Sequence, residues 1–287
     1  MAGTMNFAGA FMGTHVAETI SKGIVNPDMI VGVHSIILAA VLAAIVWNFL
    51  TWFIGLPSSS SHALIGGLMG AGVVVGGWSS LEYSSILSKV IVPLFLSPIG
   101  GFIAGYIFMV LLAWVSLKMK FKTGNFVYKK LQIVAAAFMA LTHGMNDAQK
   151  TMGIISLALL IFGEIPELYV PLWVKIACAS AIMIGTLNGG WKIIKTMGNK
   201  IFKMRPVHGF ASQSATAAVI LGASLTGAPI STTQVISSSI LGVGSSTRLS
   251  AVRWSVGKNM VVAWFLTIPA AGIVGAILMY LFLLVGI

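Results

Sequence analysis

The chain has 287 residues, of which 57% are hydrophobic and only 8% are charged, and its mean hydropathy is +0.99. A soluble domain of this length has fewer apolar and more charged residues, so the composition excludes a soluble globular protein. It predicts an all-α polytopic membrane protein, because the long uncharged stretches lack the short alternating pattern of barrel strands.

The net charge of +11 does not indicate nucleic acid binding, because most of the seventeen basic residues lie in three patches between apolar segments. The patches are Lys118, Lys120, Lys122, Lys129 and Lys130; Lys192, Lys195, Lys200, Lys203 and Arg205; and Arg248, Arg253 and Lys258. Lysine and arginine beside membrane segments mark the cytoplasmic face. We therefore expect residues 118–130 to form a cytoplasmic basic loop.

The chain opens on an apolar segment that we expect to be the second half of a membrane helix. Glu18, Lys22 and Asp28 then predict a loop. Membrane helices are expected over 31–55, 90–117 and 259–287, where the sequence is apolar and carries no charge between the basic patches.

A serine-rich segment, Leu56-Pro57-Ser58-Ser59-Ser60-Ser61-His62-Ala63, follows the first of these helices. Proline at the first helical position is typical of a helix start, and serine hydroxyls there accept the N–H groups that lack a partner. We predict a new helix from Ser58 to about Gly76.

A polar stretch, His143-Gly144-Met145-Asn146-Asp147-Ala148-Gln149-Lys150, interrupts the apolar run from 131 to 162. Neither apolar half alone crosses a bilayer core of about 30 Å, but together they do. The polar side chains would then lie near mid-membrane, where each charge costs roughly 2.5 kcal/mol without a partner. We interpret the stretch as a substrate and ion site at a break in the helix.

Within this stretch, Asp147 and Asn146 offer oxygen ligands for Na⁺, or a carboxylate that carries a proton. Gln149 is a further cation ligand or a contact between helices. The alternative for Asp147 is a pair with Lys150 that only stabilises the break. For His143, a hydrogen bond to a backbone carbonyl at the break is favoured over proton transfer.

The serine-rich segment has a counterpart, Gly227-Ala228-Pro229-Ile230-Ser231-Thr232-Thr233-Gln234, at an offset of 172 residues from Pro57 to Pro229. An offset of 177 lays Thr19 on Thr196 and Ile24 on Ile201. The repetition predicts two related halves, 1–117 and 131–287, joined by the basic loop.

The two halves are expected to be inverted. The uncharged segment 209–247 lies between two basic patches, so it must turn back, and Pro229 marks the turn. The matching segment of the first half must enter from the opposite face, because the single crossing 90–117 separates it from the first patch. Inverted repeats with two re-entrant hairpins and discontinuous helices are typical of secondary transporters, in which helix N-termini face an anion.

Other interpretations of these motifs remain open from the residues alone. The hydroxyl-rich helix starts could serve only as caps or helix contacts. A passive channel suits two dead-end hairpins less well than a transporter does. An intramembrane serine hydrolase would use Ser61 with His143, but the sequence has no Gly-x-Ser-x-Gly elbow, and the adjacent His62 points about 100° away from Ser61 on a helix.

Four segments carry a resemblance to a known family: Gly55–Gly66 (GLPSSSSHALIG), Gly144–Gly153 (GMNDAQKTMG), Thr186–Thr196 (TLNGGWKIIKT) and Gly227–Gln234 (GAPISTTQ). They resemble the inorganic phosphate transporter (PiT) family of Na⁺- or H⁺-coupled symporters. The resemblance implies that the chain is not an enzyme and needs no cofactor beyond a coupling ion. It also implies a multi-pass protein of a prokaryotic plasma membrane, with a second copy of the chain as a candidate partner in a homodimer.

The resemblance implies specific site residues. Phosphate would be bound by Ser59, Ser60, Ser61, Ser231, Thr232, Thr233 and Asn146. The cation would be bound by Asp147, Asn146 and Gln149, with Asp147 as the Na⁺ ligand if sodium is coupled. Another oxyanion, such as sulfate, is the alternative substrate. The family carries a second Asn/Asp motif whose place in this numbering falls before Met1, so the first repeat is expected to lack its beginning.

Overall fold

The computed structural model describes residues 1–21, 25 and 35–286. Lys22, Ile24 and Asp28 lie outside the described residues. The regular structure within the described ranges is helical, which confirms the predicted all-α membrane fold. Its α-helices are α1 (Ala2–Ala10), α2 (His15–Ser21), α3 (Ser35–Ile54), α4 (Ser60–Gly76), α5 (Tyr83–Ile86), α6 (Val92–Ser116), α7 (Phe121–Ile161), α8 (Leu172–Asn188), α9 (Trp191–Lys195), α10 (Pro206–Leu225), α11 (Thr232–Thr247) and α12 (Trp254–Val285). Two short π-helical segments, η3 (Leu87–Ile91) and η4 (Thr196–Lys200), continue α5 and α9.

Several helices are suited to a bilayer. Within the described ranges, three helical segments are long and apolar enough to cross a membrane: Ser35–Ile54, Tyr83–Ser116 and Trp254–Val285. Helix α8 and the following segment Trp191–Lys200 meet at an angle of 60°, and they would make a fourth span if counted as one. The predicted crossings over 31–55, 90–117 and 259–287 correspond to these three segments, where the structure describes them.

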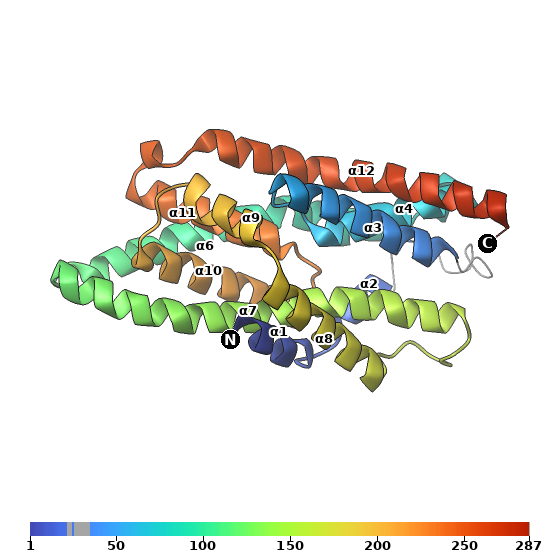
Figure 1. Ribbon diagram of the computed structural model, residues 1–287, viewed down its shortest axis with the longest axis horizontal. Coiled ribbons are helices and arrows are strands. Elements are labelled where there is room, and N and C mark those ends of the chain that lie inside the picture. Colours follow the sequence, from blue (N-terminus) through green and yellow to red (C-terminus); the bar gives the residue numbers. More distant parts are fainter. Residues whose placement is uncertain (22–24, 26–34, 287) are drawn as a thin grey trace.

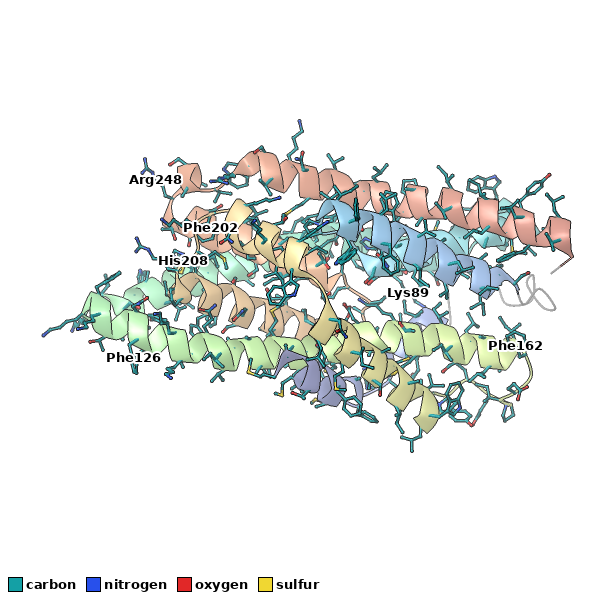
Figure 2. All side chains as sticks on the ribbon, viewed as in Figure 1. Lys89, Phe126, Phe162, Phe202, His208 and Arg248 are labelled. Carbon is teal, nitrogen blue, oxygen red and sulfur yellow. The ribbon has the colours of Figure 1, made fainter. Side chains whose placement is uncertain are left out.

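Two helical hairpins dominate the arrangement. Helices α3 and α4 form one and α10 and α11 the other, and Figure 1 shows them entering from opposite ends of the molecule, with their turns near its middle. We call the end where α6 ends and α7 and α10 begin the basic end, because Lys118, Lys120, Lys203 and Arg205 flank these helix ends in the chain. Figure 2 places Phe126, His208 and Arg248 at this end and Phe162 at the other.

Each hairpin packs against a long helix from the other half of the sequence. Helix α4 packs on α12, and α11 packs on α6. The approach is close at equivalent glycines: a Cβ atom on Gly70 would lie 1.9 Å from the carbonyl oxygen of Gly272, and one on Gly242 would lie 2.1 Å from that of Phe102. Gly70 and Gly242 are related by the offset of 172, so the repetition in sequence corresponds to a repetition in packing.

The structure corrects the prediction of a broken helix at residues 143–150. Helix α7 runs without interruption for 41 residues, which is about 60 Å. The polar side chains find partners on neighbouring helices, so the backbone need not open to satisfy them. The helix already begins at Phe121, so the loop expected over 118–130 is reduced to the few residues after α6.

Helix breaks occur elsewhere, at two glycines. Gly13 separates α1 from α2 and has φ of +100°, and Gly190 separates α8 from α9 and has φ of +91°. Both values fall in the left-handed region that side chains disfavour. The two glycines are related by the same offset of 177 that lays Thr19 on Thr196. Glu18 was expected in a loop, but it lies within α2, which follows the first break.

Candidate functional site

The site lies where the turns of the two hairpins meet α7. Helix α4 begins after Ser59, whose hydroxyl accepts a hydrogen bond from the backbone N–H of His62 at 3.3 Å. Helix α11 begins after Ser231, whose hydroxyl accepts one from the N–H of Gln234 at 3.3 Å. Both serines are therefore N-caps. Pro57 was expected at the first helical position, but it lies before the cap, because the chain still has to leave the turn at that point.

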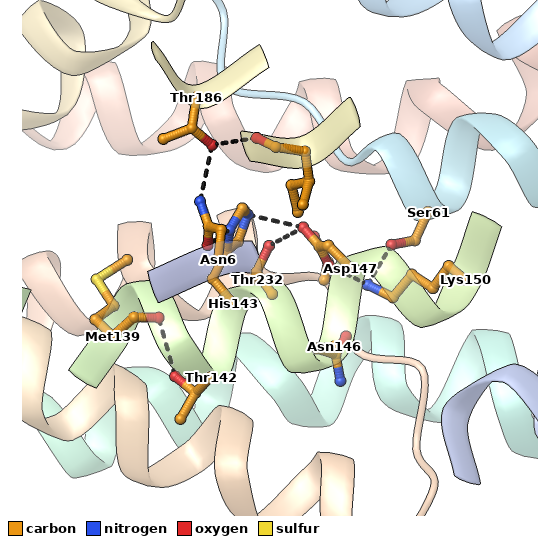
Figure 3. A network of polar contacts seen from close by, with 12 residues as sticks. Asn6, Ser61, Met139, Thr142, His143, Asn146, Asp147, Lys150, Thr186 and Thr232 are labelled. Carbon is orange, nitrogen blue, oxygen red and sulfur yellow. Dashed lines mark hydrogen bonds and ion pairs between the residues drawn. The ribbon is translucent and has the colours of Figure 1, made fainter. Parts of the chain in front are cut away.

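Asp147 on α7 is the centre of the polar contacts (Figure 3). Its Oδ2 accepts a hydrogen bond from the hydroxyl of Thr232 at 2.8 Å, and lies 3.0 Å from Nε2 of His143. Its Oδ1 lies 2.6 Å from Nζ of Lys150. Thr232 is the first residue of α11, so the carboxylate lies at the N-terminus of that helix, where a negative charge is stabilised.

Lys150 joins the two hairpins. Its side chain is buried, and its ammonium donates to the hydroxyl of Ser61 at 2.7 Å and to the carbonyl oxygen of Ile230 at 2.6 Å, in addition to Asp147. Ser61 belongs to the first turn of α4, and Ile230 to the turn before α11. The ammonium thus fixes both turns to α7, a role that the sequence reasoning did not assign to Lys150.

A chain of hydrogen bonds determines where the protons of His143 lie. The hydroxyl of Thr186 donates to the carbonyl of Ile182 at 2.7 Å, and it accepts from Nδ2 of Asn6 at 2.8 Å. Oδ1 of Asn6 therefore faces Nδ1 of His143, at 2.9 Å, and requires a proton there. A neutral ring would then present an acceptor at Nε2 to the Asp147 carboxylate. The contact between them at 3.0 Å is favourable only if the pair of His143 and Asp147 carries one further proton.

Asn146 faces the second hairpin through its amide. Its Nδ2 donates to the hydroxyl of Ser224 at 2.9 Å and is 3.4 Å from the carbonyl oxygen of Ala228. Its Oδ1 is buried and has no hydrogen-bond partner among the residues that the structure describes. A buried amide oxygen without a partner is costly, so this atom is available to a bound ligand.

The remaining predicted residues divide into two groups. Ser60 and Thr233 lie in the first turns of α4 and α11, where Ser60 is exposed and Thr233 is half-buried. Gln149 points away from Asp147: its Oε1 accepts from the backbone N–H of Val16 at 2.9 Å, and its Nε2 donates to the carbonyl of Met12 at 3.4 Å. Both groups of the Gln149 amide are therefore used in hydrogen bonds at and before the start of α2.

Three contacting residues were missed by sequence reasoning: Asn6, Thr186 and Ser224. They lie on α1, α8 and α10, far from residues 143–150 in sequence, and none belongs to the polar stretch or to the repeated hairpin motifs. Thr186 opens the segment Thr186–Thr196 that resembles the family, but no role was assigned to it. Asn6 and Ser224 are isolated polar residues in apolar helices, and without the packing of those helices no signal separates them from ordinary helix contacts.

Comparison with known proteins identifies the family. The Phosphate transporter family matches residues 1–275. The chain belongs to this family. It is 46% identical to a "Probable low-affinity inorganic phosphate transporter" of Bacillus subtilis over 278 residues, covering 96% of this chain and 83% of the relative. A protein of Rhizobium meliloti with the same description is 44% identical over 268 residues, covering 93% and 79%.

A solved structure has the same fold. The structure titled "The sodium-dependent phosphate transporter" superposes with a TM-score of 0.90 at 24% identity, covering 99% of this chain and 88% of that one. The resemblance stated from the sequence is confirmed, and the chain is an integral membrane transporter, not an enzyme. The hydrolase interpretation is wrong: the Ser61 hydroxyl contacts Lys150, and His143 contacts Asn6 and Asp147.

Proposed function

We propose that this phosphate transporter is a cation-coupled symporter of inorganic phosphate that works by alternating access. The observation that carries the proposal is the convergence of two helix N-termini, entering from opposite ends, on the ion pair of the half-buried Asp147 and the buried Lys150. Each hairpin would be re-entrant, with the turn near the midplane and both helices leaving on one face. Such a site is accessible from either face when one bundle rocks against the other.

The phosphate site would lie between the first turns of α4 and α11. The two N-termini supply partial positive charges and backbone N–H groups, which favour a compact oxyanion. The hydroxyls of Ser60, Ser61, Thr232 and Thr233 lie in these turns, and the ammonium of Lys150 adds a full positive charge. Ser59 and Ser231 hold the helix starts in place as caps, so their contribution to the anion is indirect.

The coupling cation would be bound by Asp147 with help from Oδ1 of Asn146. Two observations point to different ions. The solved structure of similar fold is titled as sodium-dependent, which favours Na⁺. The hydrogen-bond chain through Asn6 leaves one proton on the pair of His143 and Asp147, which favours H⁺. Either ion neutralises the carboxylate and lets the site bind a second negative charge.

The proposal is tested by uptake of radiolabelled phosphate into proteoliposomes. We expect uptake to depend on an inward gradient of Na⁺ or of H⁺, imposed one at a time, and to be abolished in both Asp147→Ala and Thr232→Ala. Exposed Lys130→Met, remote from the site, serves as the matched control. Unchanged uptake in both site variants would rule out this site.

Sulfate is the second candidate substrate, because hydroxyls and helix dipoles do not by themselves count the charge of an anion. A tenfold excess of unlabelled sulfate should leave phosphate uptake nearly unchanged if phosphate is the substrate. Strong competition by sulfate would shift the assignment to a broader oxyanion transporter.

A further inference from the structure

The two hairpin turns are held by short helices in unequal ways. We call residues 55–59 the first turn and residues 226–231 the second turn. At the first turn, the hydroxyl of Thr196 donates to the carbonyl oxygen of Gly55 at 3.1 Å, and Nζ of Lys192 donates to that of Phe53 at 3.0 Å. Both donors belong to the segment made of α9 and η4, which leads toward the basic end. There the carbonyl oxygen of Ile201 accepts a hydrogen bond from the backbone N–H of Arg253 at 2.8 Å. This segment therefore closes the first turn from the basic side.

Helix α2 stands in the equivalent place at the second turn. The offset of 177 that relates Thr196 to Thr19 also relates Lys192 to His15, and Gly55 corresponds to Gly227 through the offset of 172. The glycines have similar backbones, with φ of +75° and +72°. A Cβ atom on Gly227 would lie 3.2 Å from the Thr19 hydroxyl. Thr19 therefore stands beside its turn as Thr196 stands beside the first.

The hydrogen bonds at the two places differ. The Thr196 hydroxyl has two acceptors, Gly55 and, within its own helix, the carbonyl of Lys192, both at 3.1 Å. The Thr19 hydroxyl donates to the carbonyl of His15, also at 3.1 Å. That acceptor is the counterpart of Lys192. In the described part of the chain, Thr19 makes no hydrogen bond to the second turn, so helix α2 does not hold that turn in the way that Thr196 holds the first.

A cavity of about 290 Å³ occupies the open place. It is lined by His15, Glu18, Thr19, Lys89, Leu225, Thr226 and Gly227. Lys89 lies in the half of the molecule away from the basic end (Figure 2). A cavity lined by polar residues therefore reaches the second turn from the side away from the basic end. The first turn, by contrast, is covered by α9 and η4 from the basic side.

We propose that Thr196 and Thr19 are paired positioning residues, each of which holds its turn by a hydrogen bond in one of the two states of the transport cycle. In the present state Thr196 holds Gly55 and the cavity beside Thr19 is open. In the opposite state Thr19 donates to the carbonyl of Gly227 and closes the cavity, and the Thr196 hydroxyl returns to Lys192 alone. Each switch needs only rotation of a hydroxyl and a small approach of a helix, because each threonine keeps an acceptor in its own helix. The inference rests on the proposed alternating-access function.

The test measures which turn is accessible from which face. Single-cysteine probes, Leu56→Cys for the first turn and Thr226→Cys for the second, are placed in a Cys178→Ala background and reconstituted. An impermeant maleimide is then added from one face at a time. Thr196→Val should raise the labelling rate of the Leu56→Cys probe from the basic side by roughly 2- to 10-fold, the range for one net hydrogen bond, and should lower that of Thr226→Cys from the opposite side. Thr19→Val should produce the reciprocal change.

Thr247→Val is the matched control, because its hydroxyl donates to the carbonyl of Val243 within α11 and to neither turn. Thr196→Ser should restore the labelling pattern of the parent. Equal acceleration at both probes would indicate general loosening and would overturn the proposal, as would unchanged rates in both valine variants. Labelling needs no substrate, so the two proposals can fail separately. If the parent took up no phosphate but the two valine variants still changed the labelling rates reciprocally, the proposed function would be refuted and the alternate holding of the two turns would be supported.

Discussion

The ammonium of Lys150 lies 2.6 Å from the carboxylate of Asp147, which precedes it by one turn of α7. The same ammonium also contacts both hairpins, through Ser61 and Ile230. The pair is therefore more than a local compensation of charge within α7. It is the point at which the two hairpins are joined to α7 and to each other. Any movement of one hairpin relative to the other must change at least one of these contacts.

Replacement of Lys150 should be severe for this reason. Lys150→Met leaves the half-buried Asp147 carboxylate without its ammonium, and removing one partner of a pair shielded from water is strongly destabilising. We expect uptake to fall more than tenfold and the melting temperature, measured by size-exclusion chromatography after heating, to drop. The double variant Lys150→Met with Asp147→Asn should recover stability but not uptake. Full uptake by the single variant would contradict a role for the ammonium.

The contact between His143 and Asp147 leads to a prediction about pH. If H⁺ is the coupling ion, an acidic exterior should stimulate phosphate uptake by the parent protein, because the proton would then be bound from that side when phosphate enters. His143→Gln keeps a donor toward Asn6 but removes the ring, so the stimulation should disappear. Uptake is measured with a pH gradient of either sign at constant Na⁺. An undiminished response in His143→Gln would exclude this pair as the proton site.

Much of the fold could be predicted because the membrane imposes strong rules on composition. The apolar lengths located the three helical segments that are long and apolar enough to cross a membrane, and the repeated motif around Pro57 and Pro229 located both hairpins. The continuity of α7 could not be predicted in this way. A polar stretch in an apolar run indicates a broken helix only if its side chains lack partners, and the partners Thr232 and Ser61 come from helices far along the chain.

The candidate site was predicted in part. Asp147, Ser61 and Thr232 were singled out and lie together, but Gln149 was drawn from the same stretch and turns to α2. On a helix, successive residues point about 100° apart, so membership in a motif does not fix direction. The sequence alone could not show which face of α7 meets the hairpins, because α7 is packed on several sides.

Ser224, which sequence reasoning missed, should affect affinity more than rate. Its hydroxyl accepts a hydrogen bond from the Asn146 amide at 2.9 Å, and the oxygen of that amide has no hydrogen-bond partner among the described residues. Ser224→Ala should raise the phosphate concentration at half-maximal uptake by about 5-fold, with a smaller change in maximal rate. Ser246→Ala, which loses a hydroxyl bonded to the carbonyl of Val243, is the control. Equal behaviour of the two variants would argue that Asn146 does not depend on Ser224.

The close glycine contacts of the hairpins provide a test of the packing that carries the site. Gly70→Ala and Gly242→Ala each place a methyl group about 2 Å from a backbone oxygen, of Gly272 and Phe102 respectively, where neither backbone can yield without moving a helix. Overpacking of this kind costs about 1–3 kcal/mol, so both variants should melt earlier and lose most phosphate uptake. Gly222→Ala, on α10 with open space around the added carbon, should keep or slightly raise stability. If Gly70→Ala and Gly242→Ala matched Gly222→Ala in melting and uptake, the hairpins could not be seated on α12 and α6 as closely as this structure has them.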